Sequence, residues 1–245
     1  MSVFESGVSA NPRIGVRHSV ADANIGRLSG VGAGRPGDES LAGRIGAVVG
    51  AAARLVIPIV LLMVAGAAAF LYSNVPVTWI TGPGDAWLTL GQVLLPVTFL
   101  AVHLTNRRYG QGYAFAQVLG AWVVGVVAFQ FLRPTLGALA NVALPGEREV
   151  LGFGLGLLVA QLSAVFVFDR TRGPRWWSGP LFGSLWASLV LCFVAYPAAY
   201  AGTDGDWVNH MFVNLWMAAG MSVALLIPYW ALRRIIQPMS GFNGY

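Results

Sequence analysis

The sequence predicts an all-α protein that crosses a membrane several times. Of its 245 residues, 56% are hydrophobic and only 10% are charged, and the mean hydropathy is +0.66. Soluble domains carry about 25% charged residues. Apolar runs of roughly 20 residues, the length that a helix needs to cross the hydrocarbon core, recur along the chain. We therefore expect a polytopic membrane protein in contact with the lipid bilayer.

Six apolar runs are long enough to be transmembrane helices. They lie at about 46–72, 87–104, 113–132, 150–168, 181–201 and 211–232. Together they define a membrane domain over residues 46–236. A basic tail rich in Gly and Ser precedes it at 1–45, which we interpret as flexible, and a short tail follows at 237–245.

The distribution of arginine predicts the orientation of these helices. Residues 107–108, 170–175 and 233–234 hold clusters of arginine, and the loops that alternate with them have no excess of basic residues. Arginine-rich loops stay on the cytoplasmic side. We therefore expect both termini in the cytoplasm, with Arg54 reaching the same interface from the first helix.

Aromatic residues are predicted to mark the two membrane interfaces. Trp79, Trp87 and Trp207 fall near the outer ends of the runs, and Trp176 and Trp177 near the inner ends. Tryptophan is enriched at both boundaries of a bilayer. An interfacial belt therefore explains them better than stacking on a ligand.

Two pairs of glycines have the spacing of a helix-packing motif. Gly46 and Gly50, like Gly152 and Gly156, fit the pattern G-x-x-x-G, which lets two helix backbones approach closely. Gly152, Gly154 and Gly156 follow no predicted strand, so a nucleotide-binding loop is not expected there. We predict helix contacts at both pairs.

Composition excludes several functions. All 15 basic residues are arginines, and without lysine neither a Walker A loop nor a Schiff-base site is available. One cysteine, Cys192, and three scattered histidines do not favour a metal site. No nucleophile, base and orienting group can be assembled. We expect no enzyme, no catalytic residue, no cofactor and no metal, and we attribute the basic pI to membrane topology rather than to nucleic-acid binding.

Neutral polar residues share faces on three of the predicted helices. On the second helix, successive positions are separated by 4, 3, 4 and 3 residues: Gln92, Pro96, Phe99, His103 and Asn106. The fifth and sixth helices carry ladders with a spacing of four: Ser184, Ser188, Cys192 and Tyr196, then His210 and Asn214. Two interpretations are equally favoured. The three faces line a site for a planar polar solute, or their side chains form hydrogen bonds that hold the helices together.

The segment at 88–110, LTLGQVLLPVTFLAVHLTNRRYG, resembles the queuosine precursor transporter (VUT) family of six-helix bacterial inner-membrane proteins, whose members commonly show LTxGxxxxPxTFLxxDLTNRxYG. Residues 158–172, LVAQLSAVFVFDRTR, are similar to the family pattern LxxQLxDxxxFDxxR. Residues 183–192 are a looser match to SSxxGSxxDT. The resemblance covers about 46–236.

This resemblance implies a fold like that of the membrane substrate-binding subunits of energy-coupling-factor importers, and import of a 7-deazaguanine precursor of queuosine. The matched positions are Asn106, Arg107, Gln161, Asp169, Ser184 and Ser188. Together with the shared faces, they give the candidate substrate-binding residues Gln92, His103, Asn106, Gln161, Ser184, Ser188 and Asn214. Where the family usually has aspartate, this chain has His103, Ala164 and Leu191.

Two hypotheses of function follow. The first is a transporter that imports a small planar heterocycle by alternating access without ATP. The second is a structural or assembly subunit of a larger inner-membrane complex, with other membrane subunits as its partners.

Overall fold

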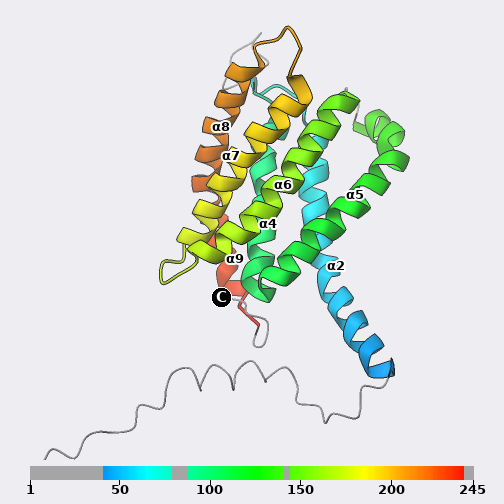
Figure 1. The fold of residues 1–245 in the computed structure, drawn as a ribbon, viewed down its shortest axis with the longest axis vertical. Helices are drawn as coiled ribbons and strands as arrows, with labels where there is room; N and C mark the ends of the chain where they lie inside the picture. Colours follow the sequence, from blue (N-terminus) through cyan, green and yellow to red (C-terminus); the bar gives the residue numbers. More distant parts are fainter. Residues whose placement is uncertain (1–40, 79–87, 141–143, 240–245) are drawn as a thin grey trace, which may run out of the picture. The chain divides into compact units, whose positions relative to one another are not determined.

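The computed structural model describes residues 41–78, 88–140 and 144–239. The chain divides into two units, Met1–Gly43 and Arg44–Tyr245, and the helical bundle belongs to the second. Its described helices, shown in Figure 1, are α2 (Leu41–Leu71), α4 (Leu90–Tyr109), α5 (Gln111–Ala140), α6 (Glu147–Thr171), α7 (Ser178–Tyr200), α8 (Trp207–Ala224) and α9 (Leu226–Ile235).

The prediction of an all-α polytopic membrane protein is confirmed. Each of the six predicted runs contains a helix, and α8 with α9 forms the last one. Within the described residues, five stretches are long and apolar enough to cross a membrane: Ile45–Leu71, Gln111–Phe129, Glu147–Thr171, Ser178–Tyr200 and Trp207–Ile235. The remaining predicted helix, α4, is more polar than these five, because buried amide, imidazole and hydroxyl groups interrupt its apolar residues.

The boundary between α4 and α5 differs from the prediction. Arg107 and Arg108 were expected in a loop after residue 104, but they form the last turn of α4. Basic side chains are favoured there by the helix dipole. The helix ends at Gly110, whose φ of 82° lies in the left-handed region that glycine tolerates, and whose N–H donates to Asn106 O at 2.9 Å. A single glycine therefore connects α4 to α5.

Two other predicted ends also shift. Residues 133–140, predicted as loop, continue α5 to Ala140, since 135–140 are mostly uncharged residues compatible with a helix. The predicted helix 211–232 is instead divided at Leu225 into α8 and α9. Pro228 explains the division, because it has no N–H to donate to the carbonyl of Ala224 four residues earlier.

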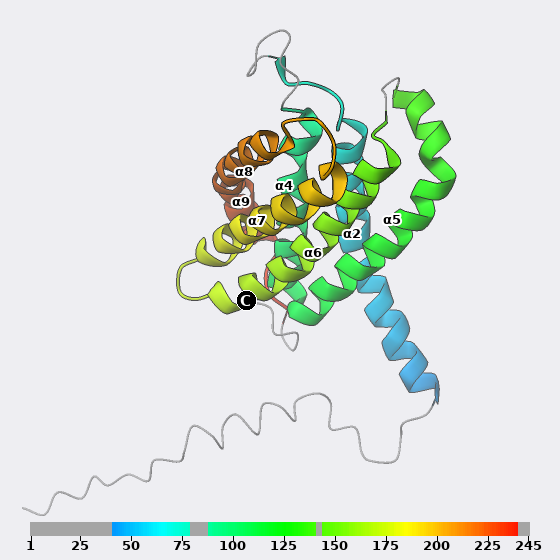
Figure 2. The same ribbon diagram turned by 45° about the horizontal axis from the view of Figure 1, so that its top comes forward.

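Helix α4 lies at the centre of the bundle. It contacts α5, α6, α7, α8 and α9. Gly91 N–H donates to Tyr72 O at 2.8 Å and so also joins α4 to the chain that follows α2. Figures 1 and 2 show α4 enclosed between α2 on one side and α8 on the other. The least apolar of the six predicted helices is thus the one most shielded from lipid.

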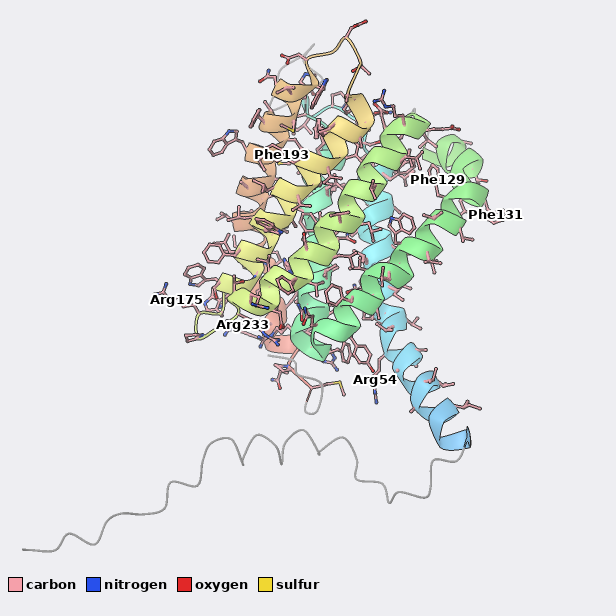
Figure 3. The ribbon with its side chains drawn as sticks, viewed as in Figure 1. Arg54, Phe129, Phe131, Arg175, Phe193 and Arg233 are labelled. Atoms are coloured by element: carbon pink, nitrogen blue, oxygen red, sulfur yellow. The ribbon has the colours of Figure 1, made fainter. Side chains whose placement is uncertain are left out.

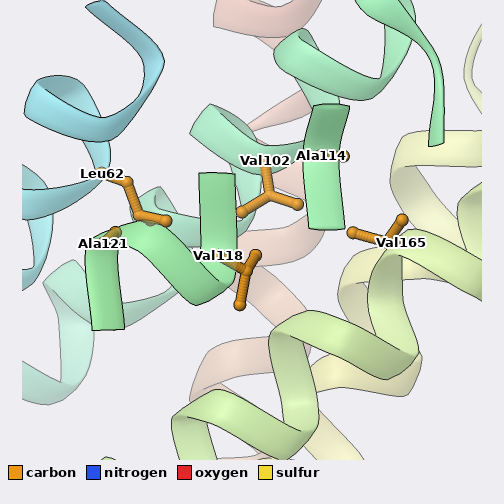
Figure 4. Close-up of a cluster of buried hydrophobic side chains, with 6 residues drawn as sticks. All are labelled: Leu62, Val102, Ala114, Val118, Ala121 and Val165. Carbon is orange, nitrogen blue, oxygen red and sulfur yellow. The ribbon is translucent and has the colours of Figure 1, made fainter. Parts of the chain in front are cut away.

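An apolar cluster joins α4 to its neighbours on one side. Figure 4 shows its buried members, contributed by α2, α4, α5 and α6: Leu62, Val102, Ala114, Val118, Ala121 and Val165. A second cluster, called here the apolar layer, joins α4, α6 and α7. Its buried members are Phe99, Ala160, Ala164, Ala187, Leu191 and Ala195.

The glycine motif at Gly152 and Gly156 forms the predicted helix contact. A Cβ at Gly152 would lie 2.8 Å from the backbone N of Ala199, and one at Gly156 would lie 2.7 Å from Ala195 Cβ. Helices α6 and α7 therefore pack with almost no side chain between them. The prediction for Gly46 and Gly50 is wrong for the described residues, because a Cβ at either position would meet nothing within 4 Å.

Arginine side chains gather at the end of the bundle where α9 terminates. Figure 3 shows Arg54, Arg175 and Arg233 at that end, and Phe193 nearer the opposite end. At the opposite end, Arg148 donates to the carbonyls of residues 198 and 201, which the end of α7 leaves without helical partners. The arginine-rich end is the one that the sequence predicts to face the cytoplasm, and the orientation of both termini stays a prediction.

Three of the tryptophans predicted to form the belt are described by the structure, and they lie near the ends of helices. Trp176 and Trp177 precede α7 at the arginine-rich end, and Trp207 begins α8. Trp79 and Trp87, also predicted to belong to the belt, lie outside the described residues.

Close packing of α6 on α7 predicts a position-specific effect of adding one methyl group. We expect Gly156→Ala to lower the free energy of unfolding by about 1–3 kcal/mol, because its Cβ would collide with Ala195. Gly154→Ala, on the same helix, meets nothing within 4 Å and should not destabilise the protein. Denaturant unfolding in detergent, followed by circular dichroism, measures both. Equal stability of the two variants would refute the contact.

Candidate functional site

The predicted polar face of α4 points into the bundle. Pro96, Phe99, His103 and Asn106 are all buried, and Gln92 is partly buried. This face meets α6 and α7, through the contacts of Gln92, His103 and Asn106. The face predicted from the 4, 3, 4, 3 spacing is therefore largely buried, and its role in binding stays a prediction.

His103 joins α4 to α7. Its Nε2 lies 3.0 Å from Ser184 Oγ, and only 1% of the residue is exposed. The imidazole stacks on the Phe168 ring of α6, with centroids 5.0 Å apart and planes inclined by 17°. Gly183 makes room for this arrangement, because a Cβ there would lie 2.7 Å from His103 Cε1. Three helices thus fix the position of the imidazole.

Asn106 lies one turn beyond His103 and joins α4 to α6. Its Nδ2 donates to Val165 O at 3.1 Å, and the residue is fully buried. Asn106 Oδ1 and His103 Nδ1 are both buried without a hydrogen-bond partner among the described residues. A buried polar atom without a partner costs about 1–3 kcal/mol. These two atoms are therefore candidate contacts for a ligand.

A second polar group lies about three turns away along α4. Gln92 Nε2 donates to the Tyr196 hydroxyl at 2.9 Å. Asn214 Nδ2 lies 3.9 Å from Cys192 Sγ, and its Oδ1 is buried without a partner among the described residues. Gln92 also accepts a hydrogen bond from Thr89 N–H at 2.9 Å and so caps the start of α4. Gln92 therefore also has a structural role.

The apolar layer separates the two polar groups. Eleven residues divide Gln92 from His103, which corresponds to about 16 Å along a helix axis. Between them, Phe99 of α4 packs with Ala164 of α6 and Leu191 of α7. Five of the seven predicted residues thus form two polar layers rather than one continuous site. We call them the His103 layer, with Asn106 and Ser184, and the Gln92 layer, with Asn214.

The remaining candidates lie beside the apolar layer. Ser188 donates to Ser184 O at 2.8 Å and is fully buried. Gln161 is 5% exposed. It directly follows Ala160, which belongs to the apolar layer. The role of Ser188 and Gln161 in substrate binding stays a prediction.

The structure changes two assignments made from sequence. His210 was grouped with Asn214 but is exposed near the start of α8, where the helix has just left the loop. Phe168 was not singled out, although it stacks on His103. The available signal was its place in the pair FD, which residues 158–172 share with the family pattern. The neighbouring Asp169 pairs with Arg172 at 2.7 Å, at the end of α6.

Residues 89–232 match the model of the family described as "Putative vitamin uptake transporter". The match spans more than half of the chain and includes every candidate site residue. The chain belongs to this family. No curated protein and no solved structure shows a significant match to it.

In this member of the vitamin uptake transporter family, the three positions noted for their lack of aspartate lie at helix interfaces. His103 is held by Ser184 and Phe168, whereas Ala164 and Leu191 belong to the apolar layer. Two of the three positions are therefore filled by packed apolar side chains. Only His103 offers a polar atom to a ligand.

The contact between His103 and Ser184 predicts a measurable coupling. We expect His103→Phe and Ser184→Ala to destabilise the protein non-additively, with a coupling of about 0.6 kcal/mol, typical of hydrogen bonds between membrane helices. Ser163→Ala is the control, because that hydroxyl donates to Ala160 O within its own helix. Unfolding of the single and double variants in detergent measures the coupling. If the effect of His103→Phe were additive with that of Ser184→Ala as well as with that of Ser163→Ala, the hydrogen bond between His103 and Ser184 would be contradicted.

Proposed function

We propose that the protein is a transporter that imports a small, planar, polar heterocycle, such as a 7-deazaguanine precursor of queuosine, across the bacterial inner membrane. The observation that carries this proposal is the His103 layer. It holds two buried polar atoms, His103 Nδ1 and Asn106 Oδ1, that have no partner among the described residues. In a bundle surrounded by lipid, such atoms are costly unless a ligand or another conformation satisfies them.

The chemistry of this layer favours a ligand that donates hydrogen bonds in the plane of a ring. Asn106 Oδ1 is an acceptor, and the Phe168 and His103 rings lie nearly parallel. Helices α4, α7, α8 and α9 contain no Asp or Glu. The amide oxygen therefore takes the role of acceptor that a carboxylate plays for a guanine-like edge, and an uncharged ligand edge suits it best.

Transport requires this layer to open. His103, Asn106, Ser184 and Ser188 are each at most 4% exposed, so the described conformation is closed around them. A solute can reach them only if the helices around α4 separate. Alternating exposure of a buried site to the two sides is how membrane transporters move a solute.

A second candidate function is a non-transporting subunit of a larger membrane complex. One observation favours it: helix α2 has a long exposed apolar face that includes Val56, Ile57 and Val60, beside the open positions of Gly46 and Gly50. Such a face suits contact with helices of another protein as well as with lipid.

Two matched substitutions separate a role in transport from a role in stability. Asn106 and Gln117 are both fully buried, and each donates to a carbonyl of a neighbouring helix, at 3.1 and 2.8 Å. Both also have a buried amide oxygen without a partner among the described residues. Gln117 joins α5 to α2, away from the proposed site. We expect Asn106→Leu to reduce uptake at least tenfold and Gln117→Met to leave it near wild type at equal membrane abundance.

Uptake is measured with a labelled 7-deazaguanine precursor in cells of a bacterium deficient in precursor import. Equal losses in the two variants would show that Asn106 acts only through stability. The abundance of each variant in the membrane fraction normalises the rates.

The queuosine content of tRNA in the same cells tests the transporter proposal itself. We expect expression of the chain to restore queuosine, which would reject the non-transporting alternative. Absence of queuosine, with purification of the chain in a stoichiometric complex with another membrane protein, would reject the transporter and support the subunit.

A further inference from the structure

A groove lies at the arginine-rich end of the bundle, apart from the His103 layer. Its volume is about 240 Å³, and it is lined by Trp176, Leu226, Ile227 and Trp230. All four side chains are apolar or aromatic, and Ile227 is 73% exposed. The groove lies beside the joint between α8 and α9, where Pro228 interrupts the helix.

An arginine lies over each of the two tryptophans that line the groove. Arg233 Cζ is 5.1 Å from the Trp176 ring centroid, and Arg234 Cζ is 4.1 Å from that of Trp230. Both distances fit cation–π contacts. The guanidinium group carries its charge at every physiological pH. An apolar groove therefore has two fixed positive charges at its edge.

One of these two arginines has a nitrogen atom without a hydrogen bond. Arg233 Nη1 is buried and has no hydrogen-bond partner among the described residues. The sequence around the groove supplies no carboxylate, since residues 170–178 and 225–239 hold five arginines and neither Asp nor Glu. Asp169, just before the first of these segments, is paired with Arg172. The two arginines at the groove therefore have no carboxylate partner in these two segments, and an external anion could take that place.

From this arrangement we propose that the groove is a binding site for an anionic phospholipid. An acyl chain lies along Leu226 and Ile227 between the two tryptophans, and the phosphate accepts hydrogen bonds from Arg233 and Arg234. Charge complementarity selects the headgroup, because guanidinium groups bind phosphate through paired N–H donors. A soluble anion would leave the apolar groove unfilled, whereas a lipid places its acyl chain in the groove and its phosphate at the arginines. Basic pockets between membrane helices bind anionic lipid headgroups in this way.

Native mass spectrometry of the full chain, released from detergent micelles, tests the proposal. The probes are phosphatidylglycerol and phosphatidylcholine with identical acyl chains. We expect one phosphatidylglycerol to be retained in preference to phosphatidylcholine. The double variant Arg233→Gln/Arg234→Gln should weaken phosphatidylglycerol binding by about fivefold or more. The control Arg54→Gln/Arg170→Gln removes the same charge at the same end of the bundle, away from the lining of the groove, and should not.

A second variant tests the apolar half of the site. Ile227→Trp narrows the groove without changing any charge, and we expect it to reduce phosphatidylglycerol retention while the protein elutes as the wild type does. Equal retention of the two lipids, or equal losses in the two double arginine variants, would overturn the proposal. Displacement of the lipid by millimolar glycerol phosphate would also overturn it, because the groove would then recognise a free anion.

Discussion

The structure depends on satisfying the polar side chains of α4 in the middle of a membrane bundle. Thr98, His103, Thr105 and Asn106 are all buried on this one helix. In contact with lipid, a polar side chain has no water to bond to and needs a partner within the protein. The four side chains find such partners in two ways. Thr98 and Thr105 donate to carbonyls of α4 itself, whereas His103 and Asn106 reach neighbouring helices.

The hydrogen bonds of His103 and Asn106 to neighbouring helices require α6 and α7 to lie close to each other and to α4. The contacts of Gly152 and Gly156 with Ala199 and Ala195 bring the two backbones together at one end. At the other end, Gly183 leaves space for the His103 ring, and Phe168 covers its face. Small residues thus determine how near the hydrogen-bonding groups come. The imidazole reaches Ser184 because the glycine beside that serine has no side chain.

Sequence was sufficient for the helices and for the buried face of α4, because hydropathy and helical periodicity are local properties. It was insufficient for pairing between helices. Gly46 and Gly50 have the same spacing as Gly152 and Gly156, yet only the second pair meets a neighbour. His210 shares a face with Asn214 but lies too near the end of α8 to be buried. The division of the polar residues into two layers depends on where Phe99 meets α6 and α7, which no single helix specifies.

The replacements at the three positions where aspartate was expected have a common physical consequence. A lone carboxylate beside Phe99 would be buried without a partner, at a cost far above that of an amide. Ala164 and Leu191 remove this cost by extending the apolar layer, and His103 keeps a hydrogen bond to Ser184. All three residues therefore favour a bundle that is stable when nothing is bound. Under the proposed function, such a bundle offers a solute the amide of Asn106, the free nitrogen of His103 and the stacked rings beside them. Selection at this site would then depend on hydrogen-bond geometry and ring shape rather than on charge.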